Sequence, residues 1–290
     1  MINMKRYAGG KTPYELFSEA VDRKNKNSPD TIALKKNKHK VEIAFRYYER
    51  AMDNRKLGLL SPSKKLSSIK QHLLGMFSSE CKLVKDFRAW HFKNNPQTYN
   101  NVCPYCTINS ANTTEHIFPK DVYPEYVVNV FNLIPVCSEC NTFKGDDILD
   151  KNDEIFTINF YTDSLPDIRY LFARITPLKD GIQFEYYLDN RNSIDRNLYA
   201  LIERHFDRYH LIDRYYDKAV QELSNIENYF KYEEITTEAD YNNAANKLIR
   251  KTDDDAIAYG KNHWKIVMYY DAASSLAFKS YIMTKLNLNP

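Results

Sequence analysis

Two Cys-x-x-Cys pairs place the strongest constraint on how this chain can fold. Cys103 and Cys106 form the first pair and Cys137 and Cys140 the second, whereas the fifth cysteine, Cys81, stands alone. Five cysteines in 290 residues are too few for a disulfide-stabilised scaffold. In a reducing compartment this spacing is typical of metal ligands, and four thiolates suit a closed tetrahedral Zn²⁺ site. We therefore expect a structural zinc that joins the two ends of a loop long enough to hold a hairpin.

The length of 290 residues allows one large domain or two small ones. No stretch of the sequence approaches the roughly 18 consecutive apolar residues that a membrane span needs, and the N-terminus lacks the apolar block of a secretory signal. We expect a cytoplasmic protein that does not enter a membrane.

Charge is distributed unevenly along the chain. Residues 1–100 contain 21 Lys and Arg against 9 Asp and Glu, whereas the remainder contains 20 against 29. The basic residues are densest between Lys24 and Lys40 and continue through Lys64 and Lys65. A polyanion is the expected partner of such a surface, although helices also carry solvated lysines for solubility alone.

Apolar periodicity predicts a chain that is mainly α-helical with a small α+β element. Helices are expected over 41–58, 67–92, 194–230, 237–251 and 255–286. The runs 168–175 and 182–188 are rich in β-branched and aromatic residues, and Asp180-Gly181 between them favours a hairpin turn. The expected organisation is a basic helical region over 1–100, a metal-organised module over 101–150, a hairpin connector over 151–192 and a helical region over 193–290.

Residues 103–146 combine several features in a fixed order. The first cysteine pair is followed by Glu115-His116 with Pro119 and Lys120, then by Asn132 in NLIPVC, and the second pair leads directly into Asn141 and the Lys144-Gly145 pair. This combination resembles the motif of HNH endonucleases, the ββα-metal finger, over about 45 of the 290 residues. The resemblance implies a metal-dependent enzyme that hydrolyses phosphodiester bonds.

The resemblance also assigns roles to individual residues. His116 matches the general base that deprotonates water, because a neutral imidazole can do so near physiological pH. Glu115 and Asn141 match the ligands of a catalytic metal, for which a carboxylate and an amide oxygen favour Mg²⁺ or Mn²⁺. Asn132 matches the asparagine that fixes the hairpin and orients His116. Lys120 and Lys144 flank these positions and are candidates for phosphate contacts, or are ordinary surface lysines.

The flanking segments resemble, less specifically, the HNH nucleases of prokaryotic antiphage systems of the Septu and retron-associated types. This resemblance implies a DNA nuclease assembled with a partner, often an ABC/SMC-type ATPase. The chain has no Walker A motif of its own, so any ATP-dependent control is expected to come from elsewhere. RNA remains open as a substrate, and a homodimer is one expectation for an enzyme that cuts both strands. The alternatives are a modification-dependent restriction or mobile-element nuclease, and a zinc module that binds nucleic acid or protein without cutting.

Overall fold

The computed structural model describes residues 1, 3–78, 81–95 and 101–288. Contacts divide the chain into two compact units, one of residues 3–164 and the other of the residues from 165 onward together with Met1. The structure is mainly α-helical with two small antiparallel sheets, as the sequence predicts. No helix within the described residues is long and apolar enough to span a bilayer.

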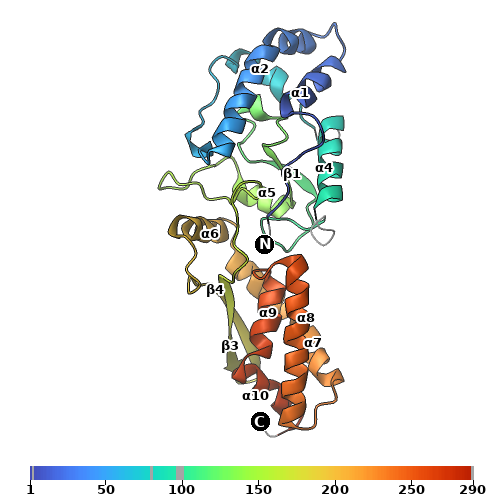
Figure 1. Cartoon of the computed structure of the whole chain (residues 1–290), viewed down its shortest axis with the longest axis vertical. Helices are drawn as coiled ribbons and strands as arrows, with labels where there is room; N and C mark the ends of the chain where they lie inside the picture. The colour runs from blue at the N-terminus through green and yellow to red at the C-terminus, as the bar shows by residue number, and fades with distance from the viewer. Residues whose placement is uncertain (2, 79–80, 96–100, 289–290) are drawn as a thin grey trace. The chain divides into compact units, whose positions relative to one another are not determined.

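The first unit contains helices around a small two-stranded sheet (Figure 1). In chain order its elements are α1 (Pro13–Asp22), α2 (Pro29–Asp53), η1 (Leu57–Leu59), η2 (Ser67–Ile69), α3 (Lys70–Leu74), α4 (Lys82–Asn94), β1 (Thr113–His116), η4 (Pro124–Tyr126), β2 (Leu133–Val136) and α5 (Ser138–Lys144). The N-terminal helices and the cysteine module therefore belong to one unit, although the sequence suggests successive regions.

Local sequence explains where the first helices begin. Thr12 and Glu15 form a capping box at the start of α1. Ser28 caps α2 and Pro29 occupies its first turn, so this helix begins well before the segment 41–58 in which apolar periodicity predicts it.

The single helix predicted over 67–92 is wrong. Gly75 caps the C-terminus of α3 by donating its N–H to the Gln71 carbonyl, and Cys81 is the N-cap of α4. The boundary expected between the regions 1–100 and 101–150 adjoins residues 96–100, which lie outside the described residues.

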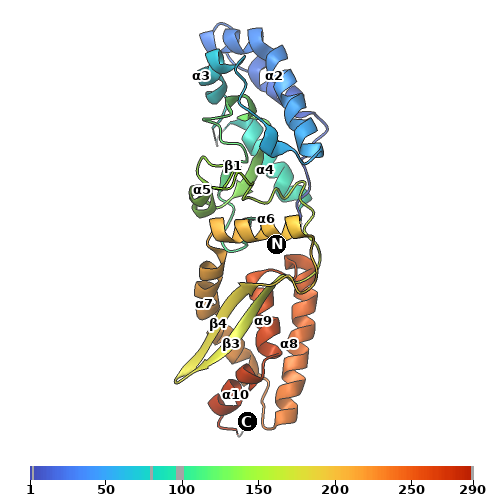
Figure 2. The ribbon, with the colours of Figure 1, turned by 90° about the vertical axis from the view of Figure 1, so that its left-hand side faces the viewer.

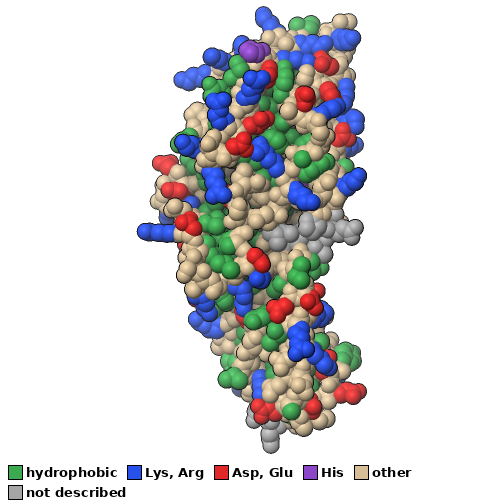
Figure 3. All heavy atoms as spheres, in the orientation of Figure 1, with side chains coloured by type: hydrophobic (Ala, Val, Ile, Leu, Met, Phe, Trp, Pro, Cys, Tyr) green, Lys and Arg blue, Asp and Glu red, His purple; other side chains and the backbone are tan. Residues whose placement is uncertain are grey.

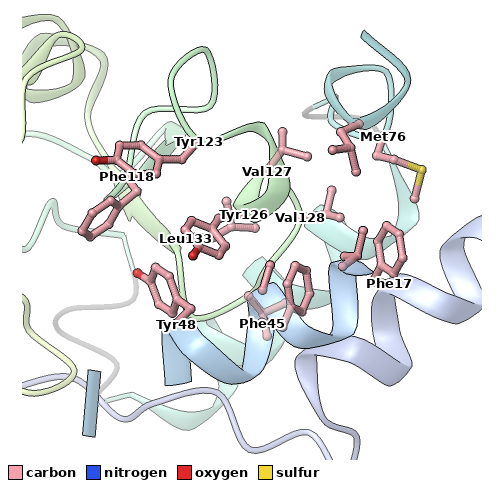
Figure 4. Close-up of a cluster of buried hydrophobic side chains, with 14 of the residues drawn as sticks. Phe17, Phe45, Tyr48, Met76, Phe118, Tyr123, Tyr126, Val127, Val128 and Leu133 are labelled. Atoms are coloured by element: carbon pink, nitrogen blue, oxygen red, sulfur yellow. The ribbon is translucent and has the colours of Figure 1, made fainter. Parts of the chain in front are cut away.

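One buried cluster joins the helices to the β1–β2 hairpin. Figure 4 shows Phe45 and Tyr48 of α2 pointing toward Tyr126 and Leu133 of the hairpin. The Tyr48 and Tyr126 rings are 4.9 Å apart at 62°, an edge-to-face arrangement that favours aromatic packing. Because this cluster is shared, α2 forms a rigid support for the hairpin loop.

The second unit is built on the predicted hairpin, with strands paired from Leu171↔Leu188 to Leu178↔Gly181. The strands are β3 (Leu171–Leu178) and β4 (Gly181–Leu188), and the helices are α6 (Arg196–Arg208), α7 (Leu211–Tyr232), α8 (Glu238–Tyr259), α9 (Trp264–Ala273) and α10 (Leu276–Lys285). Figure 2 shows β4 beside α7 and β3 beside α9. The predicted helix over 194–230 is interrupted at His210, whose φ of 49° lies in the left-handed region.

Candidate metal centre and active site

The four paired cysteines come together at the base of the β1–β2 hairpin. Their sulfur atoms all lie within 4.8 Å of one another, and all four residues are buried. The Sγ atoms of Cys106 and Cys137 are 3.9 Å apart. Backbone N–H groups of Ile108 and Cys140 each point at a sulfur, of Cys106 and Cys137 respectively, at 3.4 Å. Such N–H groups favour negative charge on sulfur, the form in which cysteine binds a metal.

These distances fit a tetrahedral zinc site. A Zn–S bond of about 2.3 Å places the sulfurs of a regular tetrahedron about 3.8 Å apart. The cluster consists of four soft sulfur ligands, a set that favours Zn²⁺ over Mg²⁺ or Ca²⁺. Four protein ligands complete the coordination sphere, so a metal held here has a structural role.

Strand pairing and the start of α5 explain why the pairs meet. β1 and β2 are antiparallel, with Thr113 opposite Val136 and His116 opposite Leu133. The first cysteine pair precedes β1 and the second follows β2 at the start of α5, so the ends of the hairpin carry both pairs. Residues 103–146 therefore contain two paired strands followed by a helix.

His116 ends β1 with its imidazole buried. Its Nε2 lies 2.9 Å from the Val127 carbonyl oxygen, and its ring packs against Phe77 with centroids 4.4 Å apart. A carbonyl only accepts hydrogen bonds, so Nε2 carries the proton and Nδ1 has the lone pair of a base. Burial is the largest cause that lowers the pKa of His116 to about 4, which keeps the ring neutral at physiological pH.

Glu115 forms a buried ion pair with Lys144 at the end of α5. The Lys144 Nζ lies 3.0 Å from the Glu115 Oε1, and the two side chains are 1% and 8% exposed. Burial raises the pKa of the Glu115 carboxyl, and the Lys144 ammonium opposes that shift. The proposed metal ligand therefore already faces a cation.

The remaining predicted residues divide between this site and the surface. Asn141 lies partly exposed on α5, one turn before Lys144. Lys120 is 43% exposed and pairs with Asp121 at 3.0 Å, so the structure places it in solvent, whereas Lys144 is enclosed. Apart from the cysteines, the described residues contain no cluster of three or more His, Cys, Asp or Glu groups suited to a metal.

Asn132 closes the loop between the two strands. Its Oδ1 accepts the Phe118 N–H at 2.7 Å and the Tyr48 hydroxyl at 3.2 Å. Its Nδ2 donates to the carbonyls of Phe118 and Tyr126 at 3.0 and 3.2 Å. The amide thus has both its donors and both lone pairs engaged. Its bonds hold the loop that also contains Val127, whose carbonyl binds the His116 ring.

Sequence reasoning missed the residues that hold these groups. Val127 contributes only its carbonyl, which carries no sequence signal, and Phe77 contacts His116 from outside residues 103–146. Tyr48 lies at a core position of α2, where a tyrosine in a helical pattern indicates packing alone. Its hydroxyl was the available signal, because a buried tyrosine O–H usually donates a hydrogen bond to a nearby polar group.

We expect Lys144→Met to destabilise the first unit by about 3 kcal/mol, because it leaves the Glu115 carboxylate buried without a partner. Urea denaturation measures the change. Lys120→Met is the matched control and should have little effect, since its ion pair is exposed. The double variant Glu115→Gln with Lys144→Met should recover much of the loss. If Lys144→Met and Lys120→Met lowered the free energy of unfolding equally, the buried pair would have no special role in stability.

The chain is similar to Septu protein PtuB of Bacillus thuringiensis, with 45% identity over 51 residues. The matched segment covers 16% of this chain and 20% of that protein, so the chain spans about a fifth of the relative it matches. No protein-family profile and no solved structure matches the chain.

Proposed function

We propose that the protein is a metal-dependent HNH endonuclease that hydrolyses DNA phosphodiester bonds with His116 as general base. The observation that carries the proposal is the buried His116 ring, whose Nε2 is bound to the Val127 carbonyl, while Glu115, the preceding residue of β1, pairs with Lys144. A histidine buried only for packing has no need of acidic and basic neighbours, whereas hydrolysis of a phosphodiester needs them.

The residues divide the work of hydrolysis as follows. His116 accepts the proton of the attacking water at Nδ1, because Nε2 is already committed to Val127. Asn132 keeps the imidazole in place by holding the loop that contains Val127. Zinc bound to the four cysteines would hold the two ends of the hairpin together and would have no open position for substrate.

Glu115 and Asn141 are the proposed ligands of Mg²⁺ or Mn²⁺, which would stabilise charge on the phosphate and on the leaving oxygen. A buried carboxylate and an amide are oxygen donors of the kind these ions prefer. Two protein donors leave coordination positions for water and phosphate. The ammonium of Lys144 shows that a positive charge is accommodated at Glu115.

We further propose that this nuclease acts in antiphage defence. The support is the similarity of 51 residues to Septu protein PtuB, together with the resemblance of the flanks to defence nucleases. An ATPase partner of the ABC/SMC type would supply the control that the chain, without a phosphate-binding loop, does not provide.

Purified protein is expected to nick or linearise supercoiled plasmid with Mg²⁺ or Mn²⁺ and to lose this activity without them. Asn141→Ala should lower the rate at low metal concentration and recover partly at high concentration, because the variant removes one ligand. Thr142→Ala, one residue further along the exposed side of α5, is the control. If Asn141→Ala cut as fast as the wild type at every metal concentration, the assignment of Asn141 as a ligand would be wrong. Cutting without added metal would contradict the mechanism.

A further inference from the structure

A groove of about 850 Å³ runs between α2 and the segment that follows η1. Lys40, Ile43 and Tyr47 line it from one face of α2, at the i, i+3 and i+7 spacing of a helical stripe. Leu59, Lys64 and Lys65 line it from the other side. The opposite face of α2 is packed into the core through Phe45 and Tyr48, so the helix is fixed while its groove face remains open.

The groove carries uncompensated positive charge. Within the described part of the chain no acidic side chain lines it, and none of Lys40, Lys64 and Lys65 forms an ion pair. By contrast Lys35 and Lys38, from the same basic run, both face Asp22 of α1. Figure 3 shows Lys and Arg side chains with hydrophobic ones between them over the region where Figure 1 places α2. An anion is the complementary ligand.

The groove also exposes apolar surface between these charges. Tyr47 is 60% exposed, Ile43 41% and Leu59 79%, although each is large enough to bury substantial area. Paired bases in a duplex have no free face to offer a tyrosine, whereas unpaired bases stack on it. Lysines beside an exposed aromatic ring are the combination found in proteins that bind single strands.

The groove is anchored to the proposed active site. Glu125 accepts the Ser63 N–H at 2.6 Å, and Tyr123 donates its hydroxyl to the Leu60 carbonyl at 3.2 Å. Tyr126 lines the groove, and the next residue along the chain, Val127, binds His116. A strand in the groove would therefore lie against the same loop that positions the general base.

We propose that this groove binds a single-stranded segment of DNA, with the three lysines contacting phosphates and Tyr47 stacking on an unpaired base. The choice of DNA rests on the proposed nuclease function. The apolar side chains of Ile43 and Leu59 in the lining match the unsubstituted C2′ of deoxyribose better than a ribose hydroxyl.

The test is fluorescence anisotropy with the full-length protein and a labelled single-stranded DNA, its duplex form and an RNA of the same sequence, without added Mg²⁺ or Mn²⁺. Tyr47→Ala should raise the Kd for the single strand about tenfold or more, and Tyr47→Phe should keep it within about twofold. Tyr232→Ala, which alters a 79% exposed tyrosine of the other unit, is the matched control. All of these side chains are at the surface, so folding should be unaffected.

Replacing Lys40, Lys64 and Lys65 with alanine should reduce the slope of log affinity against log salt by about 2, at roughly 0.7 per phosphate contact. The same change at the exposed Lys151, Lys179 and Lys231 is the charge-matched control. The proposal would be overturned if the groove and control variants lost the same affinity for the single strand. It would also be overturned if Tyr47→Ala weakened duplex binding as much as single-strand binding, or if the protein bound the RNA more tightly than the DNA. Because no cutting is measured, a groove that fails this test leaves the nuclease proposal standing, and DNA binding at the groove would survive an inactive enzyme.

Discussion

Replacing His116 with alanine is expected to lower plasmid cleavage by about 10² to 10⁴-fold, the usual contribution of a general base. The reason is geometric: Nε2 is held by the Val127 carbonyl, so Nδ1 is the atom left to take a proton from water. Initial rates of nicking with Mg²⁺ or Mn²⁺ measure the effect. In cells, the same variant should lose any protection against phage that the wild-type protein provides.

The control must separate lost chemistry from a lost fold. The imidazole is buried against Phe77, so alanine leaves a cavity, and His116→Asn tests the position with a polar side chain that cannot act as the base. Both variants should retain zinc and the urea midpoint of a folded protein. His72→Ala removes a partly exposed histidine that pairs with Asp30 at 2.6 Å and should cut normally. Normal cutting by both His116 variants would show that another group is the base.

The cysteine cluster and the hairpin could be predicted because their signals are local. The spacing of the cysteines predicted the cluster of Cys103, Cys106, Cys137 and Cys140. The turn at Asp180-Gly181 predicted the β3–β4 pairing. Each Cys-x-x-Cys pair and the Asp180-Gly181 turn involve residues a few positions apart, and the two pairs, separated by 30 residues, are linked in sequence only by their shared metal-binding chemistry.

What could not be predicted depends on contacts between distant segments. The pair of Glu115 with Lys144 forms only because α5 packs back on β1, so the sequence left Lys144 as a candidate surface lysine. The basic run likewise appears uniform in sequence. Asp22 of a different helix neutralises Lys38, while Lys40 two residues later lines the groove. Tertiary packing therefore selects which lysines of the run present charge to a ligand.

Removing the metal from the four cysteines is expected to unfold the finger, because a structural zinc contributes about 10 to 16 kcal/mol. This contribution is as large as the total free energy of unfolding of a typical domain, about 5 to 15 kcal/mol. The wild type should contain about one zinc per chain. Cys137→Ser should lose zinc, and Cys81→Ser, which alters a half-buried cysteine outside the cluster, should keep it.

The two tryptophans allow the unfolding to be located. Trp90 lies on α4 in the first unit, where it packs on Tyr7, and Trp264 begins α9 in the second. With Trp264→Phe, fluorescence reports the first unit alone and should shift to a solvent-exposed spectrum when a zinc chelator is added. With Trp90→Phe it reports the second unit, which holds none of the four ligands and should not change. If the Trp90 spectrum does not change after complete zinc release, the first unit stays folded around α4 without metal, and its stability must come from the aromatic cluster that the hairpin shares with α2.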